Sequence, residues 1–290
     1  MRAHFARPAL KRQVRAASLR LDPVGTSAGR VTKDMAQPEI YQFACLRDNY
    51  GVLVHDPEGG VTLSIDAPEA AAVRQALADR GWTLTHILVT HHHADHTAGI
   101  AALKAETKCQ VIGPKAESAR IPGLDAAVGA PDVLRLGTLE VRVLDTPGHT
   151  IGHITYWIPE ANVAFVGDTL FAMGCGRVLE GTAEMMWSSL RTIADLPGDT
   201  ALYCGHEYTV SNGKFGITIE PGNARLAERL AEAEATRAAG KPTLPTRVDL
   251  ELETNVFLRA GSKAIRERVN LPSAPDWKVF ADLRERKDRF

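Results

Sequence analysis

Residues 90–96 have the sequence Thr-His-His-His-Ala-Asp-His. Within this run His91, His93, Asp95 and His96 combine imidazole with carboxylate, the ligand types that suit zinc, manganese and iron. The spacing provides two pairs of ligands, which indicates a site for two metals. Such a site would support hydrolysis, because a bound metal lowers the pKa of water toward about 7.

Three further polar residues could complete two coordination spheres. Each directly follows a glycine at the end of an expected strand: His149, Asp168 and His206. A side chain in that position can point into a cleft that several strand ends share. Taken singly, each could equally be a turn residue. Together with residues 91–96, they complete two sites.

We divide the candidate ligands into two groups and a bridge. The first group contains His91, His93 and His149. The second group contains Asp95, His96 and His206. The bridge is Asp168, because the two oxygens of a carboxylate can hold metals about 3.5–4 Å apart. We expect Asp95 and Asp168 to be essential for catalysis.

Three residues of this region also have other possible roles. Asp95 could cap a following helix, but a cap would not explain the neighbouring histidines. We expect His92 to point away from the metals, and His153 to support the site or to pack beneath it.

Short apolar segments alternate with helical ones over much of the chain. The expected strands are 40–44, 52–55, 61–65, 86–89, 111–113, 133–136, 139–144, 153–157, 164–166 and 201–204. The expected helices of this part are 68–80, 97–106 and 183–196. Strands interleaved with helices indicate an α/β protein. Each candidate ligand follows a strand, so all should meet at one edge of the fold.

Composition divides the chain into three parts. Residues 1–37 form a basic extension that we expect to be disordered, and residues 38–206 form the catalytic domain. Residues 207–290 form a small, highly charged helical domain with helices at 224–239 and 274–289. An arginine-rich, acid-poor leader can also be a mitochondrial transit peptide. We expect a cytoplasmic protein. A mitochondrial location is the alternative if the basic N-terminus is a transit peptide.

The bulk properties exclude several classes of function. The 290 residues carry a formal net charge of −1, which argues against nucleic-acid binding driven by overall charge. No stretch approaches the roughly 20 apolar residues of a membrane helix. The cysteines form no C-x-x-C pair and favour a reducing compartment over a disulfide framework. They are Cys45, Cys109, Cys175 and Cys204.

The ordered set of motifs resembles the metallo-β-lactamase superfamily, which implies a four-layer αβ/βα sandwich with a dinuclear metal site at one edge. Within it, residues 40–290 resemble the glyoxalase II (hydroxyacylglutathione hydrolase) family, chiefly in the stretches 167–171, 175–182 and 203–209. The resemblance implies an enzyme of methylglyoxal detoxification. It would hydrolyse the thioester S-D-lactoylglutathione to D-lactate and glutathione, using two divalent metals, zinc foremost, with iron or manganese possible.

The resemblance also implies which residues hold glutathione. The matching positions are Arg177, Tyr208, Arg284 and Lys287. Arginine and lysine suit this ligand because it carries two carboxylates. Leu179 stands where some members have a tyrosine that contacts glutathione, so that contact is absent here. Val256 replaces a proline that is often found at its position, and only a local backbone effect is expected.

The sequence is also compatible with other functions. The main alternative is a glutathione persulfide dioxygenase of the same superfamily, which needs a single iron. A β-lactamase is less favoured, because the C-terminal domain would be extra. A non-catalytic metal-binding module would be expected to lack one or more ligands. We expect a monomer that binds a small glutathione thioester, without nucleic acid or membrane partners.

Overall fold

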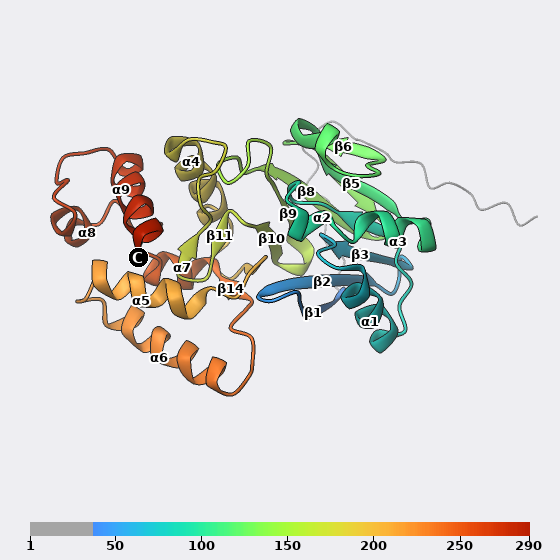
Figure 1. Ribbon diagram of the computed structural model, residues 1–290, viewed down its shortest axis with the longest axis horizontal. Helices are drawn as coiled ribbons and strands as arrows, with labels where there is room; N and C mark the ends of the chain where they lie inside the picture. Colours follow the sequence, from blue (N-terminus) through green and yellow to red (C-terminus); the bar gives the residue numbers. More distant parts are fainter. Residues whose placement is uncertain (1–36) are drawn as a thin grey trace, which may run out of the picture.

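The computed structural model describes residues 37–290. The extension expected at 1–37 therefore lies outside the described residues, apart from its last residue. Two six-stranded sheets and several helices make up the described part (Figure 1). Within residues 37–290, no helix combines the length and the hydropathy that crossing a membrane requires.

The first sheet contains the first six strands in their order along the chain. They are β1 (Glu39–Cys45), β2 (Asn49–Asp56), β3 (Val61–Ile65), β4 (His86–Leu88), β5 (Gln110–Pro114) and β6 (Ala126–Val128). Strands β1 to β3 pair antiparallel, whereas β3 to β6 pair parallel. The parallel strands place the loops that follow β3, β4 and β5 at one edge.

The second sheet has the order β14-β13-β10-β9-β8-β7. Its strands are β7 (Val133–Leu136), β8 (Leu139–Asp145), β9 (Ile154–Ile158), β10 (Val163–Gly167), β13 (Ala201–Cys204) and β14 (Thr246–Arg247). Strands β10 and β13 are parallel, so the loops that follow them share an edge. The small hairpin of β11 (Leu170–Phe171) and β12 (Gly174–Cys175) follows β10.

Apolar side chains hold the layers together. Between the two sheets, Leu63 and Leu88 belong to the same buried cluster as Tyr156 and Phe165. Helices α1 (Ala70–Arg80) and α3 (Ile100–Thr107) cover the outer face of the first sheet. Helix α4 (Ala183–Ala194) covers the second sheet. The expected four-layer helix–sheet–sheet–helix sandwich is thus confirmed.

The C-terminal helices pack on the α4 side of the sandwich, away from α1 and α3 (Figure 1). They are α5 (Thr209–Ile219), α6 (Ala224–Ala238), α7 (Val248–Thr254), α8 (Lys263–Arg268) and α9 (Asp276–Arg289). Phe257 and Phe280 join the same core as residues of α4 and β13. The helices expected at 224–239 and 274–289 are confirmed with small shifts at their ends.

The helix expected at 97–106 is wrong in one respect, because two helices occupy this region. Helix α2 (Ala94–Thr97) ends before Gly99, and α3 begins after it. The backbone of Gly99 lies against the loop that follows β3, and its N–H donates to the carbonyl oxygen of Ala67 (2.8 Å). A β-carbon there would lie 2.7 Å from the backbone nitrogen of Ala70. This close approach interrupts the helix.

The sequence did not predict α5, although this helix has eleven residues. It contains Gly213 and Gly216, which are poor helix formers. A β-carbon on Gly213 would lie 2.9 Å from Leu230 of α6 and from Met173. The glycine thus serves close helix packing, a tertiary effect that local propensity does not reveal.

Candidate metal centre

All seven candidate ligands lie at one edge of the sandwich. They come from the segments that follow β4, β8, β10 and β13. The loop after β4 carries His91 and His93, and α2 carries Asp95 and His96. The remaining three are His149, Asp168 and His206. The structure therefore brings together residues that are up to 115 positions apart in the sequence.

The first group consists of three imidazoles whose ring nitrogens converge. His93 Nδ1 lies 3.1 Å from His91 Nε2 and 3.0 Å from His149 Nε2. One nitrogen from each ring lies within 4.8 Å of the others, which is close enough for a single metal ion. His91 and His149 are buried, and His93 is half-buried.

The second group combines two imidazoles with a carboxylate. Asp95 Oδ2 lies 3.3 Å from His206 Nε2 and 3.7 Å from His96 Nε2. Asp95 lies in the first turn of α2 and does not cap α3, which Gly99 precedes. Its side chain faces the other candidate ligands, so the capping role considered from the sequence is excluded.

Asp168 lies between the two groups. Its Oδ1 atom is 3.4 Å from His96 Nε2. Its Oδ2 atom is 3.3 Å from His206 Nε2 and 3.5 Å from His149 Nε2. This carboxylate is buried and contacts both groups, as a bridging ligand would.

Other residues hold the imidazoles from behind. His96 Nδ1 lies 2.8 Å from Asp66 Oδ2, and His91 Nδ1 lies 3.0 Å from Thr90 Oγ1. His149 Nδ1 donates to the backbone oxygen of Arg177 (2.9 Å). Such a bond fixes the ring and leaves the other nitrogen free to bind a metal.

Among residues 37–290, two buried atoms of the cluster find no hydrogen-bond partner: His96 Nε2 and Asp168 Oδ1. A buried polar atom without a partner costs about 1–3 kcal/mol. Cations placed among these imidazoles and carboxylates would satisfy both atoms. The donor set therefore fits two divalent metals.

The charges of the cluster support the same interpretation. Burial and the neighbouring His96 and His153 lower the pKa of His91 well below its usual value. Neutral imidazole is the form that binds metal. Burial would lower the pKa of His206, but its bonds with Asp168 and Asp95 raise it to about 10. A proton thus balances the carboxylates here, and a metal ion would replace it.

His92 and His153 have the orientations that we expected from the sequence. His92 points away from the cluster, and its Nδ1 lies 2.8 Å from Glu117 Oε2. His153 accepts a hydrogen bond at Nε2 from the backbone N–H of Asp168 (3.1 Å) and stacks on His91. His153 therefore supports the bridging residue from beneath.

A cavity of about 550 Å³ opens beside the cluster. At one end it is lined by His149 and Asp168. The structure brings all four candidate substrate residues into its walls: Arg177, Tyr208, Arg284 and Lys287. Leu179 is exposed and is not among the lining residues.

The cationic side chains of this cavity differ in exposure and in the contacts that hold them. The Arg284 guanidinium is buried and donates to the backbone oxygen of Cys175 (2.8 Å) and to Asp288 (3.0 Å). Lys287 Nζ donates to Ser211 Oγ (2.9 Å). The Arg177 side chain is 70% exposed. Its Nε atom lies 3.7 Å from Asp288 Oδ1, so an anionic ligand would meet two cations held by hydrogen bonds and one that is largely exposed.

Tyr208 joins the cavity to the cluster. Its ring stacks on His206, with the ring centres 4.9 Å apart and the planes within 5° of parallel. Burial and the acidic side chain of Asp48 raise the pKa of Tyr208 to about 12. The phenol therefore stays protonated at neutral pH and can donate a hydrogen bond.

Three acidic residues near the cluster were not identified from the sequence. Asp66 accepts hydrogen bonds from the backbone N–H and the hydroxyl of Thr90, and it contacts His96. Glu117 accepts from the backbone N–H groups of His92 (2.8 Å) and Gly152 (2.9 Å). The third is Asp48, beside His206. Of the three, only Asp66 could have been found from the sequence, because it directly follows an expected strand.

Comparison with known proteins agrees with this arrangement. Residues 60–206 match the family model described as metallo-beta-lactamase superfamily, and residues 207–290 match hydroxyacylglutathione hydrolase C-terminus. A hydroxyacylglutathione hydrolase of Brucella anthropi is 54% identical over 252 residues, covering 87% of this chain and 97% of that protein. The chain belongs to the hydroxyacylglutathione hydrolase family. The resemblance inferred from the sequence is confirmed.

Solved structures show that this hydroxyacylglutathione hydrolase family member shares its fold more widely. A metallo-beta-lactamase from Staphylococcus aureus has a TM-score of 0.59 at 21% identity, covering 87% of this chain and 72% of that one. ETHE1 from Myxococcus xanthus has a TM-score of 0.54 at 29% identity, covering 73% and 95%. These similarities are similarities of the sandwich fold.

Proposed function

We propose that this protein hydrolyses S-2-hydroxyacylglutathione thioesters, foremost S-D-lactoylglutathione, to the 2-hydroxy acid and glutathione. The observation that carries the proposal is the single cavity that joins two kinds of chemistry. Metal-type ligands line one end, and cationic side chains line the other. Family membership supports the same activity.

We propose that the first group and Asp168 hold one metal, and that the second group and Asp168 hold another. When bound, the metals would lower the pKa of water toward neutrality and polarise the thioester carbonyl. Zinc is our first choice, and the mixed donor set also suits iron or manganese. The convergent ring nitrogens and the unpartnered buried atoms support two metals.

The chain's own residues would bind and orient the substrate. Arg284 and Lys287 are placed to bind one carboxylate of glutathione, and Arg177 can reach another. The Tyr208 phenol can donate to the peptide. Holding the tripeptide in one pose would fix its thioester over the cluster, and such orientation lowers the barrier of the reaction.

We assign residues 38–206 to the catalytic domain and 207–290 to the substrate-binding domain. The latter is supported by Tyr208, Arg284 and Lys287 in the cavity wall. We also propose a monomer in the cytoplasm, and four buried free cysteines fit a reducing compartment.

The test compares two thioesters of the same 2-hydroxy acid, one of glutathione and one of a neutral thiol. Thioester absorbance should fall rapidly for the glutathione ester, and the neutral analogue should show a much lower kcat/KM. Oxygen uptake with glutathione persulfide, measured in parallel, tests the dioxygenase alternative. Oxygen uptake without thioester hydrolysis would overturn the proposed activity.

A further inference from the structure

The turn between β1 and β2 contacts the second ligand group. Asp48 Oδ1 lies 3.0 Å from His206 Nδ1. Asn49 Nδ2 donates to Asp95 Oδ2 (3.2 Å) and to the Asp95 backbone oxygen (3.3 Å). Two adjacent residues therefore hold two of the three ligands in the second group.

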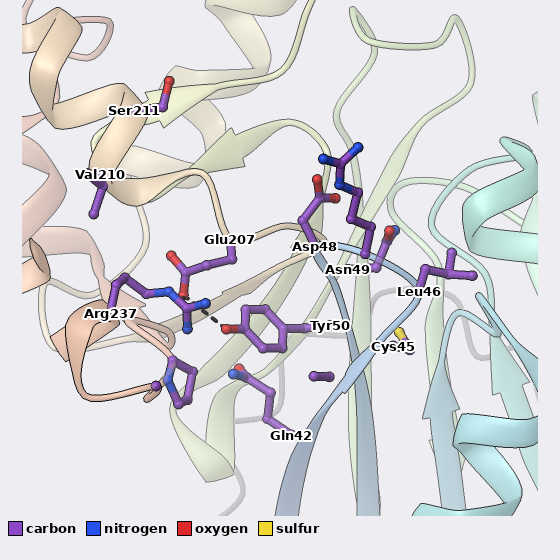
Figure 2. A pocket seen from close by; sticks show the side chains of 14 residues that line it. Gln42, Cys45, Leu46, Asp48, Asn49, Tyr50, Glu207, Val210, Ser211 and Arg237 are labelled. Carbon is purple, nitrogen blue, oxygen red and sulfur yellow. Dashed lines mark hydrogen bonds and ion pairs between the residues drawn. The ribbon is translucent and has the colours of Figure 1, made fainter.

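The backbone of this turn is fixed to the segment that carries His206. The N–H of Tyr50 donates to the carbonyl oxygen of Gly205 (2.8 Å), and the N–H of Glu207 donates to that of Asp48 (2.9 Å). Figure 2 shows Asp48, Asn49 and Tyr50 along the hairpin, with the Tyr50 hydroxyl bonded to Glu207 (3.0 Å). These bonds give the turn a fixed position.

The first ligand group is held by other parts of the chain. Thr90 contacts His91, and the backbone oxygen of Arg177 accepts from His149. Glu117 holds the backbone at His92. The hydrogen bonds of Asp48 and Asn49 to candidate ligands, within residues 37–290, go to the second group alone.

We propose that Asp48 and Asn49 are positioning residues for the second metal and leave the first metal unaffected. This inference rests on the proposed two-metal site. Asp48 accepts the Nδ1–H of His206, so Nε2 is the nitrogen that faces Asp95 and Asp168 and that would bind the metal once its proton is displaced. Asn49 holds one carboxylate oxygen of Asp95 and so fixes its orientation. Removing such partners costs about 10–100-fold in metal affinity.

The fold should tolerate changes at Asp48. Its side chain is 42% exposed and borders an open cavity of about 620 Å³, seen in Figure 2. Water can occupy the space that a shorter side chain leaves. Arg47 offers a matched control, because it is exposed on the same turn and lines the same cavity.

The experiment titrates zinc into metal-free protein in competition with a chromophoric chelator, which reports the affinity for each zinc without measuring activity. The parent and Arg47→Ala should bind two zinc ions. Asp48→Ala and Asn49→Ala should keep the first affinity and weaken the second by about 10–100-fold. Asp48→Asn should lie between, because its amide oxygen still accepts the His206 N–H.

Circular dichroism of the metal-free proteins checks that the variants fold. If Asp48→Ala does not fold, the zinc titration of Asp48→Asn replaces it as the test. Equal zinc affinities in all variants and the parent would overturn the inference, as would an equal loss at both sites. A parent that binds fewer than two zinc ions would instead overturn the two-metal proposal itself, so the two failures are distinguishable.

Discussion

In the proposed two-metal site, Asp168 is the carboxylate that both ligand groups share. Asp168→Ala removes a side chain that contacts His96, His149 and His206 together. We expect thioester hydrolysis to fall by more than about 100-fold, beyond the range for residues that only support ligands. Steady-state kinetics with metal analysis of the same sample checks this. Full turnover in the variant would remove Asp168 from the site.

The cationic end of the cavity should govern substrate binding. Lys287→Ala removes one cation that is partly held by Ser211. A hydrogen bond to a charged group contributes about 1.5–3 kcal/mol, so KM should rise about tenfold or more while kcat changes little. Lys278→Ala is the control, because Lys278 is exposed on the same helix α9. A fall in kcat with KM unchanged would contradict the assigned binding role.

At the scale of the elements, Gly99 allows the segment between α2 and α3 to pack closely against the loop that follows β3. In Gly99→Ala the new β-carbon would meet backbone atoms of Ala67 and Ala70 at 2.9 and 2.7 Å. Backbone cannot move aside as a flexible side chain can, so we expect a loss of about 1–3 kcal/mol in the free energy of unfolding. Urea denaturation measures it.

Gly222→Ala is the matched control, because nothing lies within 4 Å of a β-carbon there. Equal unfolding free energies for the two variants would show that the approach at Gly99 is not required.

Asp56 connects turns of the two sheets. It accepts from the backbone N–H of Gly59 (2.9 Å) near β3 and from that of Thr138 (2.7 Å) between β7 and β8. Burial opposes ionisation, but these hydrogen bonds lower the pKa of Asp56 below its usual value. Asp56→Asn should therefore lower the free energy of unfolding by about 1.5–3 kcal/mol at neutral pH.

The pH dependence of this effect follows from the direction of the shift. A carboxyl whose pKa is lower in the folded state stabilises the fold above its unfolded pKa, about 3.9. That contribution is lost as the pH falls through the folded pKa. The difference between the parent and Asp56→Asn should shrink below about pH 4, as urea denaturation at several pH values would show. A difference that is constant with pH would contradict this account.

The sequence predicts those elements whose signals are local. The apolar run 61–65 and the buried strand 201–204 have the bounds expected, because composition and flanking turns define them. Two-residue strands such as β11 carry too little pattern to detect. Four candidate ligands could be found because they cluster within residues 91–96, and the other three because each follows a strand and a glycine. Asp48 could not, because its partner His206 lies 158 positions away.

At the scale of the whole molecule, the cavity depends on both halves of the chain. His149 and Asp168 come from the sandwich, whereas Tyr208, Arg284 and Lys287 come from residues 207–290. Phe257 and Phe280 pack the C-terminal helices into the core that α4 and β13 share. Burial of such a side chain contributes about 1.5–3 kcal/mol, so the two halves should stay together while substrate binds and product leaves.

In the proposed reaction, a two-metal cluster hydrolyses a glutathione thioester. The most direct test adds zinc stepwise to metal-free protein and measures S-D-lactoylglutathione hydrolysis at each step. We expect no hydrolysis without metal, and a rate that rises with zinc and levels off at two equivalents per chain. Full hydrolysis by the metal-free protein, or none with two zinc ions bound, would contradict the account.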